Sequence, residues 1–302
     1  MSGQILLCPI CSHQDPAPMP FGYLFNGKWL DAMECQSCGI IFIHPQPSSE
    51  EIRRLYSKEY FEGDFRCGHE GSYFDDATLD HLADESLLDR IKKYKPEGDF
   101  LEVGCAGGAF LNAARKAGYN VRGVEFSEDA SEFARTKFHL DVVAGDLMDA
   151  HFSPQSFDVI FMGDVLEHLP KPGASLGEIN RIMKQGGLLV IECPMQTNTL
   201  FSRLGFLLYG FARKKAAVHL PPYHLFEYRP ASMRNLLLRS GYRTVRSSES
   251  IISPSRIALR GSFLENIGKK VLQYPNYVLT HAFGMFGDRI EIFAMKQANL
   301  PS

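Results

Sequence analysis

The chain has 302 residues, of which 45% are hydrophobic, and it carries a formal net charge of −3. This length allows one large domain with one or two small modules, and the slightly acidic balance argues against a dedicated nucleic-acid-binding protein. No apolar run reaches the ~18 residues of a membrane span, and MSGQILLCPI does not resemble a signal peptide, so a cytoplasmic location is expected.

Four of the seven cysteines form two matched pairs near the N-terminus. Cys8 and Cys11 make one C-x2-C pair, Cys35 and Cys38 make another, and 23 residues separate the pairs. Two such pairs can supply four thiolates to one tetrahedral metal ion, which predicts a closed, structural Zn2+ site. A redox C-x-x-C motif is the competing interpretation, but these pairs lie outside any βαβ pattern.

Residues 1–45 are therefore predicted to form a zinc ribbon. Short strands are expected within it at 22–25, 29–33 and 40–43. The remaining cysteines stand alone and are expected to be small buried residues or incidental thiols: Cys67, Cys105 and Cys193.

Residues 46–95 are predicted to be a helical linker or lid. Ser48 and Glu51 have the spacing of a capping box, which should start a short helix. From Thr78 to Tyr94 the apolar residues keep a helical period, and Pro96 ends the run. This second helix is expected to pack beside the first strand of the next domain and to close over a ligand.

The segment FLEVGCAGGAF, residues 100–110, is the most informative of the chain. A buried strand carries Glu102, and a helix opens at Ala109. The turn between them consists of small residues: Gly104, Cys105, Ala106, Gly107 and Gly108. Glycine accepts positive φ and has no Cβ, so the backbone can approach a ligand, and the helix N-terminus adds N–H donors. This pattern predicts a nucleotide-like cofactor at the carboxyl end of a strand in a doubly wound sheet.

The following strands also end in polar or small residues. Residues 120–126 end near Glu125, 23 residues after Glu102, where a carboxylate can accept hydrogen bonds from both ribose hydroxyls. Residues 141–146 end at Asp146. Residues 157–163 are a continuous apolar run, which is typical of a strand buried on both faces. The alternation of strands and helices predicts an α/β fold.

Together these segments resemble the class I methyltransferases that depend on S-adenosylmethionine (SAM). EVGCAGG is similar to their glycine-rich motif, GVEFS to the ribose-binding acid, AGDLMD to the adenine-side acid, and FDVIFMGDVLEHLPKP to the motif of the fourth strand. The resemblance is good over 96–200 and weaker up to the final strand in GDRIEIFAMK. It implies a seven-stranded doubly wound sheet whose last strand is antiparallel, within a domain spanning 96–302.

The resemblance also implies the residues of the SAM site. Glu125 would bind the ribose, Asp146 the adenine with Leu147 against its ring, and Glu102 would brace the glycine turn through its amides. The cofactor-binding residues are expected to be Glu102, Gly104, Ala106, Gly108, Glu125, Phe126, Asp146, Leu147 and Gly163. Family members usually carry glycine where Ala106 stands, so we expect a slightly altered turn that still binds. A helix N-cap is the alternative role for Asp146.

After the fifth strand, residues 198–230 are predicted to form a lid over the acceptor and 251–286 an insertion. Residues 198–215 are apolar with a basic end, so a helix lying on a membrane surface is the alternative to a lid. The catalytic candidates are His224, His168 and Asp164, because an acceptor hydroxyl needs a base and histidine titrates near neutral pH. His219 is a further candidate, and Glu167 and His168 could instead be helix first-turn residues.

The first hypothesis for the function is O-methylation of a sugar or related small molecule, including a lipid-linked one. C- or N-methylation stays open, as does an RNA methyltransferase that grips RNA with the ribbon. A SAM-binding interaction module without turnover is an alternative of another class. A nicotinamide oxidoreductase is disfavoured because Ala106 interrupts the G-x-G-x-x-G pattern.

Overall fold

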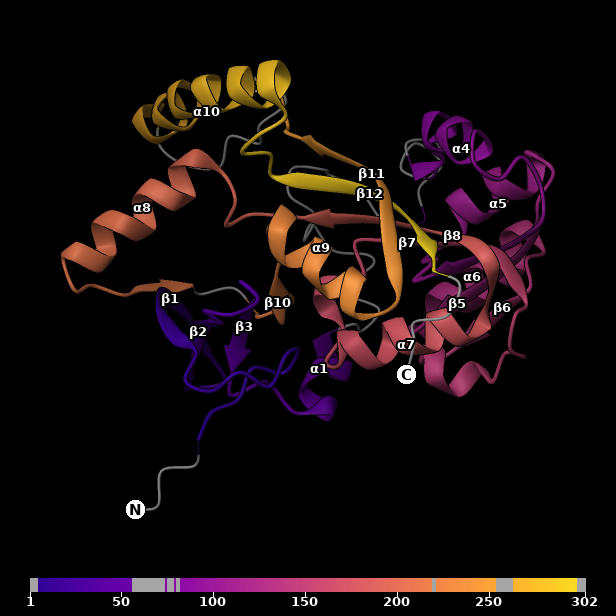
Figure 1. Ribbon diagram of the computed structural model, residues 1–302, viewed down its shortest axis with the longest axis horizontal. Helices are drawn as coiled ribbons and strands as arrows, with labels where there is room; N and C mark the ends of the chain where they lie inside the picture. Colours follow the sequence, from indigo (N-terminus) through magenta and orange to yellow (C-terminus); the bar gives the residue numbers. More distant parts are fainter. Residues whose placement is uncertain are drawn as a thin grey trace.

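The structure is a computed structural model that describes residues 5–55, 74, 79, 82–218, 221–253 and 263–297. A seven-stranded sheet forms its centre, in the order β11-β12-β8-β7-β4-β5-β6 (Figure 1). Its strands are β4 (Asp99–Val103), β5 (Asn120–Glu125), β6 (Val142–Ala144), β7 (Phe157–Gly163), β8 (Met183–Pro194), β11 (Tyr242–Ser250) and β12 (Arg289–Lys296). Strand β12 runs antiparallel to both β8 and β11, while β4 to β8 are parallel. The predicted doubly wound sheet with an antiparallel last strand is confirmed.

Helices cover both faces of this sheet because the central strands are apolar on both sides. In β7, Val159 and Phe161 belong to one buried cluster while Ile160 and Met162 belong to the other. Alternate side chains of a strand point to opposite faces, so a continuous apolar run fills two cores. The covering helices are α4 (Glu85–Lys92), α5 (Ala109–Lys116), α6 (Glu128–Phe138), α7 (Pro172–Ile182) and α9 (Pro230–Arg239).

The helix expected from Thr78 to Tyr94 is not continuous: the described Leu79 and Leu82 are helical, whereas Ala83 and Asp84 are not. Helix α4 begins only at Glu85, because the Asp84 side chain caps it by accepting hydrogen bonds from the amides of Ser86 and Leu87. The expected helix after Ser48 is confirmed as α1 (Ser49–Leu55), with both hydrogen bonds of the capping box between Ser48 and Glu51.

A second sheet of five strands combines two distant parts of the chain, in the order β10-β3-β2-β1-β9. The N-terminal part supplies β1 (Ala17–Phe25), β2 (Lys28–Glu34) and β3 (Ile41–His44) as an antiparallel meander. The segment after β8 supplies both edges, β9 (Ala216–Val218) and β10 (Phe226–Glu227). The predicted ribbon strands are confirmed, but the ribbon sheet is completed by residues from the predicted lid.

Two further helices, α8 (Leu200–Phe211) and α10 (Phe263–Phe283), lie at the end of the molecule away from α4 to α6 (Figure 1). Short 3-10 helices follow β6 and β7: η1 (Leu147–Ala150) and η2 (Leu166–His168). Within the described part of the chain, no helix has the length and apolar character needed to cross a membrane.

Candidate functional site

The glycine turn lies between β4 and α5 and rests on the end of β5. Ala106 has a φ of 46°, in the left-handed region that favours glycine. Its N–H donates to Glu125 Oε2 at 2.8 Å, and the N–H of Ser127 donates to Glu125 Oε1 at 2.8 Å. Each carboxylate oxygen keeps a second lone pair. Glu125 can therefore hold the turn and still accept hydrogen bonds from a ribose.

Glycine is required at two positions of the turn by close packing as well as by conformation. Gly104 and Gly108 have φ values of 75° and 79°. A Cβ on Gly104 would collide with the side chain of Val165, and a Cβ on Gly108 would come within 2.7 Å of Leu140. Because Gly108 is the N-cap of α5 and has no side chain, no side-chain hydrogen bond caps the first turn of α5. This leaves the helix N-terminus suited to a ligand.

Glu102 does not brace the turn as predicted. The N–H groups of Gly104 and Cys105 donate to the carbonyl of Val124, and that of Ala106 donates to Glu125. Glu102 is buried instead, and its Oε2 has no hydrogen-bond partner. Burial, together with the nearby charge of Glu125, raises the pKa of Glu102 well above its usual range. The bracing role belongs to Glu125.

The other expected cofactor residues lie at the same edge of the sheet. Asp146 caps η1 by accepting a hydrogen bond from the amide of Met148 at 2.9 Å, which is the alternative role considered for it. Leu147 is buried, whereas Phe126 is partly exposed and has the guanidinium of Arg53 above its ring. Gly163 ends β7. Their contacts with a cofactor stay predictions.

The histidine candidates meet in a partly buried cluster after the end of β7. His168 lies in η2 and His224 just before β10, and their ring centroids are 5.0 Å apart. His168 Nδ1 donates to the carbonyl oxygen of Tyr223 at 2.7 Å. His224 Nδ1 lies 3.2 Å from Glu227 Oε1. Glu167 completes the cluster, with Oε1 3.6 Å from His168 Nε2.

The pKa values of the two histidines are shifted in opposite directions. Burial and the neighbouring His224 lower the pKa of His168 to about 4, so its ring is neutral at pH 7. Burial also opposes a charge on His224, but the hydrogen bond with Glu227 outweighs it and raises the pKa of His224. Burial raises the pKa of Glu167 to about 8, with Asp164 adding to the shift. Of the two rings, His224 is the stronger base.

The third catalytic candidate, Asp164, is engaged by an arginine. Its Oδ1 accepts a hydrogen bond from Arg289 Nη2 at 2.6 Å, and half of the side chain is exposed. Asp164 has a φ of 54°, directly after Gly163. Because the guanidinium of Arg289 already occupies one oxygen of this carboxylate, the geometry favours histidine over Asp164 as the group that meets an acceptor hydroxyl. His219 lies outside the described residues.

Sequence reasoning missed two residues of this site. Glu227 orients His224, and Arg289 neutralises Asp164. Glu227 could have been considered as a partner of His224 because it lies only three residues later in the sequence. Arg289 lies 125 residues from Asp164, and only the antiparallel position of β12 beside β8 brings it there.

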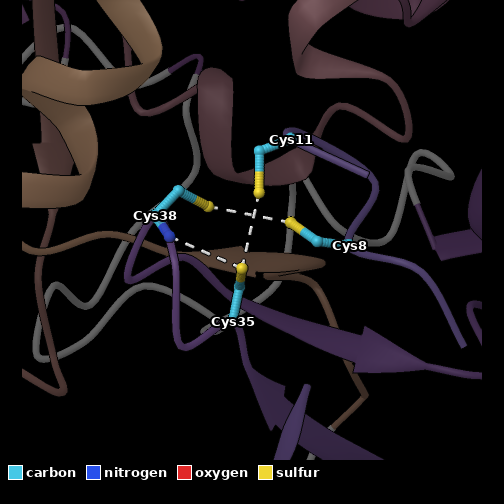
Figure 2. Close-up of side chains that lie close together, drawn as sticks. All are labelled: Cys8, Cys11, Cys35 and Cys38. Carbon is cyan, nitrogen blue, oxygen red and sulfur yellow. Dashed lines mark hydrogen bonds between the residues drawn. The ribbon is translucent and has the colours of Figure 1, made fainter. Parts of the chain in front are cut away.

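The four paired cysteines converge on one point (Figure 2). The Sγ atoms of Cys8 and Cys38 are 3.7 Å apart, and those of Cys11 and Cys35 are 3.5 Å apart. Four sulfurs at 2.3 Å from a tetrahedral metal would be about 3.8 Å apart, so the cluster fits such an ion. Cys105 and Cys193 are buried as expected, and Cys67 lies outside the described residues.

The two cysteine turns repeat one hydrogen-bond pattern. The N–H of Cys8 donates to the carbonyl of His13 and that of Cys35 to Ile40, each at 2.9 Å. In both turns the first cysteine carbonyl also accepts a hydrogen bond from the amide four residues later. Backbone amides point at sulfur as well, from Ile10 to Cys8 and from Cys38 to Cys35. Two equivalent turns around one centre fit a metal ion better than a redox pair.

Comparisons with known proteins agree with this fold. Residues 101–191 match the family described as "Methyltransferase domain". Demethylmenaquinone methyltransferase from Staphylococcus aureus (strain JH9) is 32% identical over 119 residues, which cover 37% of this chain and 49% of that protein. The chain thus spans about half the length of the curated relatives it matches.

Solved structures show the same fold. A SAM-dependent methyltransferase from Archaeoglobus fulgidus superposes with a TM-score of 0.51 at 23% identity, over 79% of this chain and 97% of that chain. The YcgJ protein from Bacillus subtilis gives a TM-score of 0.50 at 16% identity, over 72% and 100%. With the order of the sheet, these matches show that residues 101–191 are similar to a methyltransferase domain and that the large sheet has the fold of these solved structures.

Proposed function

We propose that this protein transfers a methyl group from SAM to a hydroxyl group of a small-molecule acceptor, with His224 as the general base. The observation that carries the proposal is the pairing of His224 Nδ1 with Glu227 Oε1 at 3.2 Å, in a partly buried cluster at the edge where the glycine turn lies. Glu227 fixes the ring so that Nε2 is the nitrogen left to accept a proton.

The residues present fit SAM. Glu125 offers two buried carboxylate oxygens beside the turn, suited to a ribose diol, and Glu102 Oε2 is buried without a partner next to the same turn. Such an unpartnered oxygen is costly unless a donor reaches it, and the amino group of an amino-acid-like cofactor is one such donor. When bound, SAM supplies an electrophilic methyl group.

The chain's own residues then have three tasks. The turn and Glu125 position the cofactor, and the end of β7 with Asp164 and Arg289 forms a wall beside it. His224 takes the hydroxyl proton, while neutral His168, whose Nδ1–H is bound to the carbonyl of Tyr223, can accept one hydrogen bond at Nε2. A positioned general base contributes about 10²–10⁴ in rate.

The acceptor is proposed to be small. The curated relatives are named for action on demethylmenaquinone, a small molecule, and the chain itself is slightly acidic. A sugar hydroxyl, free or lipid-linked, is the first candidate. Methylation at carbon or nitrogen, and methylation of RNA, are the alternatives. The transfer assay described below distinguishes them.

We propose that the metal is Zn2+, in a structural role. Four thiolates suit zinc and leave no open coordination position. The proposed division is a ribbon at 1–45, a linker at 46–95 and a methyltransferase domain at 96–302 with a lid at 198–230 and an insertion at 251–286.

The decisive experiment is transfer of a labelled methyl group from SAM to nucleotide sugars, lipid-linked sugars, quinols and RNA. His224→Ala should lower kcat by about 10²–10⁴ with SAM affinity nearly unchanged. SAM binding without transfer to any acceptor class would favour a non-catalytic module. Near-parental turnover in His224→Ala would show that another group takes the proton.

A further inference from the structure

Helix α8 presents its apolar stripe to solvent instead of to the protein. Leu204, Leu207, Leu208 and Phe211 have the i, i+3, i+4, i+7 spacing of one helix face. Their side chains are 46%, 56%, 66% and 80% exposed, and no residue of α8 is buried. A helix that packs in a core shows the opposite orientation, so this stripe is made for a partner outside the chain.

The orientation of α8 is fixed by its opposite face. The ring of Phe206 stacks on that of Phe21 in β1, with centroids 5.2 Å apart and planes 17° apart. At the start of α8, the N–H of Leu200 donates to Asn276 Oδ1 at 2.9 Å, and the guanidinium of Arg203 lies over the ring of Phe286. The outward stripe is therefore held in place by packing on β1 and α10.

Helix α10 extends the same surface. Helices α8 and α10 contact each other and lie together at one end of the molecule (Figure 1). Tyr274 and Val278 have i, i+4 spacing on α10 and are 61% and 56% exposed, and Phe283 and Met285, at and just after the end of the helix, are 67% and 45% exposed. Nine of the eighteen large hydrophobic side chains exposed in the described residues belong to α8, α10 and this turn.

The chain segment that contains α8 carries only basic charges. Residues 199–218 contain four basic residues and no acidic one: Arg203, Arg213, Lys214 and Lys215. Arg213 and Lys214 are exposed directly after α8, while Lys215 is bound to Asp31. Residues 273–287 carry no Asp, Glu, Lys or Arg. A surface that combines exposed apolar side chains with exposed basic ones is complementary to an anionic lipid bilayer.

We propose that α8, α10 and the Arg213–Lys214 pair form a membrane-docking surface that binds anionic lipid bilayers peripherally. A second copy of the chain is the poorer occupant, because residues 199–218 and 273–287 of that copy would offer no acidic side chain to pair with Arg213 and Lys214. Helix α8 has 12 residues, about 18 Å of helix, so it can lie in the interface but cannot span it. The proposal does not depend on the methyltransferase reaction.

The test is sedimentation of the full chain with phosphatidylcholine vesicles, with and without phosphatidylglycerol. We expect binding to the anionic vesicles, weakened by salt and weak on pure phosphatidylcholine. Phe211→Asp should reduce the partition coefficient tenfold or more. Each of Arg213→Glu and Lys214→Glu should reduce it about fivefold or more, since one basic residue near such a surface contributes about 1 kcal/mol.

Matched controls separate docking from general effects of the substitutions. Leu238→Asp replaces a leucine that is 57% exposed on α9, and Lys116→Glu replaces an exposed lysine at the end of α5. Both should bind vesicles like the parent, and circular dichroism should show every variant folded. The proposal is overturned if the parent does not sediment with anionic vesicles or if Phe211→Asp binds as well as Leu238→Asp. Light scattering that shows a dimer lost in Phe211→Asp would instead assign the surface to self-association.

Discussion

Phe42 of β3 pairs in antiparallel register with Phe226 of β10, two residues after His224. The N–H of Ile43 donates to the carbonyl of Leu225 at 3.0 Å, which extends the pairing toward the histidine. Cys35 and Cys38 lie in the turn immediately before β3. The four-cysteine cluster and the candidate base are thus connected by a single pair of strands.

Removal of the metal should therefore lower turnover as well as loosen the ribbon. A module of this size has little core of its own, so metal binding supplies much of its folding free energy. Without it, β3 no longer holds β10, and His224 loses its position. We expect chelation to lower kcat at least tenfold, measured together with metal content by elemental analysis.

Two measurements distinguish a displaced His224 from general damage to the protein. SAM affinity by calorimetry should stay close to parental, because the glycine turn belongs to the other sheet. Adding Zn2+ back should restore kcat. Full turnover in metal-free protein would contradict the connection between the cluster and His224.

Glu125→Ala should weaken SAM binding by about 1.5–3 kcal/mol, the range of a hydrogen bond to a charged group. The structure adds a second effect, since the N–H groups of Ala106 and Ser127 would lose their acceptor. The melting temperature should fall together with the affinity. Asp141→Ala, at the opposite end of the neighbouring strand, is the control and should change neither quantity. Parental SAM affinity in Glu125→Ala would show that Glu125 only braces the turn.

Much of the large sheet was predictable because its signals are local. The apolar run of residues 157–163 coincides with β7, and the capping box at Ser48 marks the start of α1. The cysteine spacing likewise predicted the cluster, because C-x2-C turns bring sulfurs together within four residues. Acids and glycines at strand ends predicted the edge of the sheet where the site lies.

The missed features depend on contacts between distant residues or on competing local bonds. No local pattern predicts that β9 and β10 complete the N-terminal sheet, because two- and three-residue strands carry no period of their own. The break before α4 was missed because the apolar period continues through Ala83, while Asp84 forms a cap that the period cannot reveal. The bracing of the glycine turn was assigned to Glu102 instead of Glu125 because both acids lie at or near strand ends beside the same turn.

Glu227→Gln should shift the pH dependence of catalysis to lower pH. The Glu227 carboxylate raises the pKa of His224, and the base must be neutral to act, so activity falls as the pH drops through that pKa. An amide holds the ring without its negative charge, which lowers the pKa of His224. The acid limb of kcat/KM against pH should therefore move down, with a lower plateau. Glu178→Gln, in a surface pair with Arg181, should leave the profile unchanged. An unshifted acid limb in Glu227→Gln would remove His224 as the group that titrates.

Glu167→Gln should stabilise the protein, and more so at higher pH. Burial raises the pKa of Glu167 from about 4.5 to about 8, so the folded protein keeps a proton that the unfolded chain releases. The stability associated with this carboxyl group is complete below pH 4.5 and is lost as the pH rises toward 8. An amide cannot ionise and avoids that loss.

The measurement is the difference in melting temperature between Glu167→Gln and the parent across this pH range. At pH 8 we expect a gain of at least about 1 kcal/mol, or roughly 2–4 °C, shrinking toward zero near pH 5. The lowered pKa of His168 has the opposite pH trend, but it is present in both proteins and largely cancels in the difference. Glu97→Gln, at an exposed carboxyl group, should show no such pH-dependent gain. A constant or negative difference would mean that Glu167 is ionised in the folded protein, held as the counter-charge of a protonated His224.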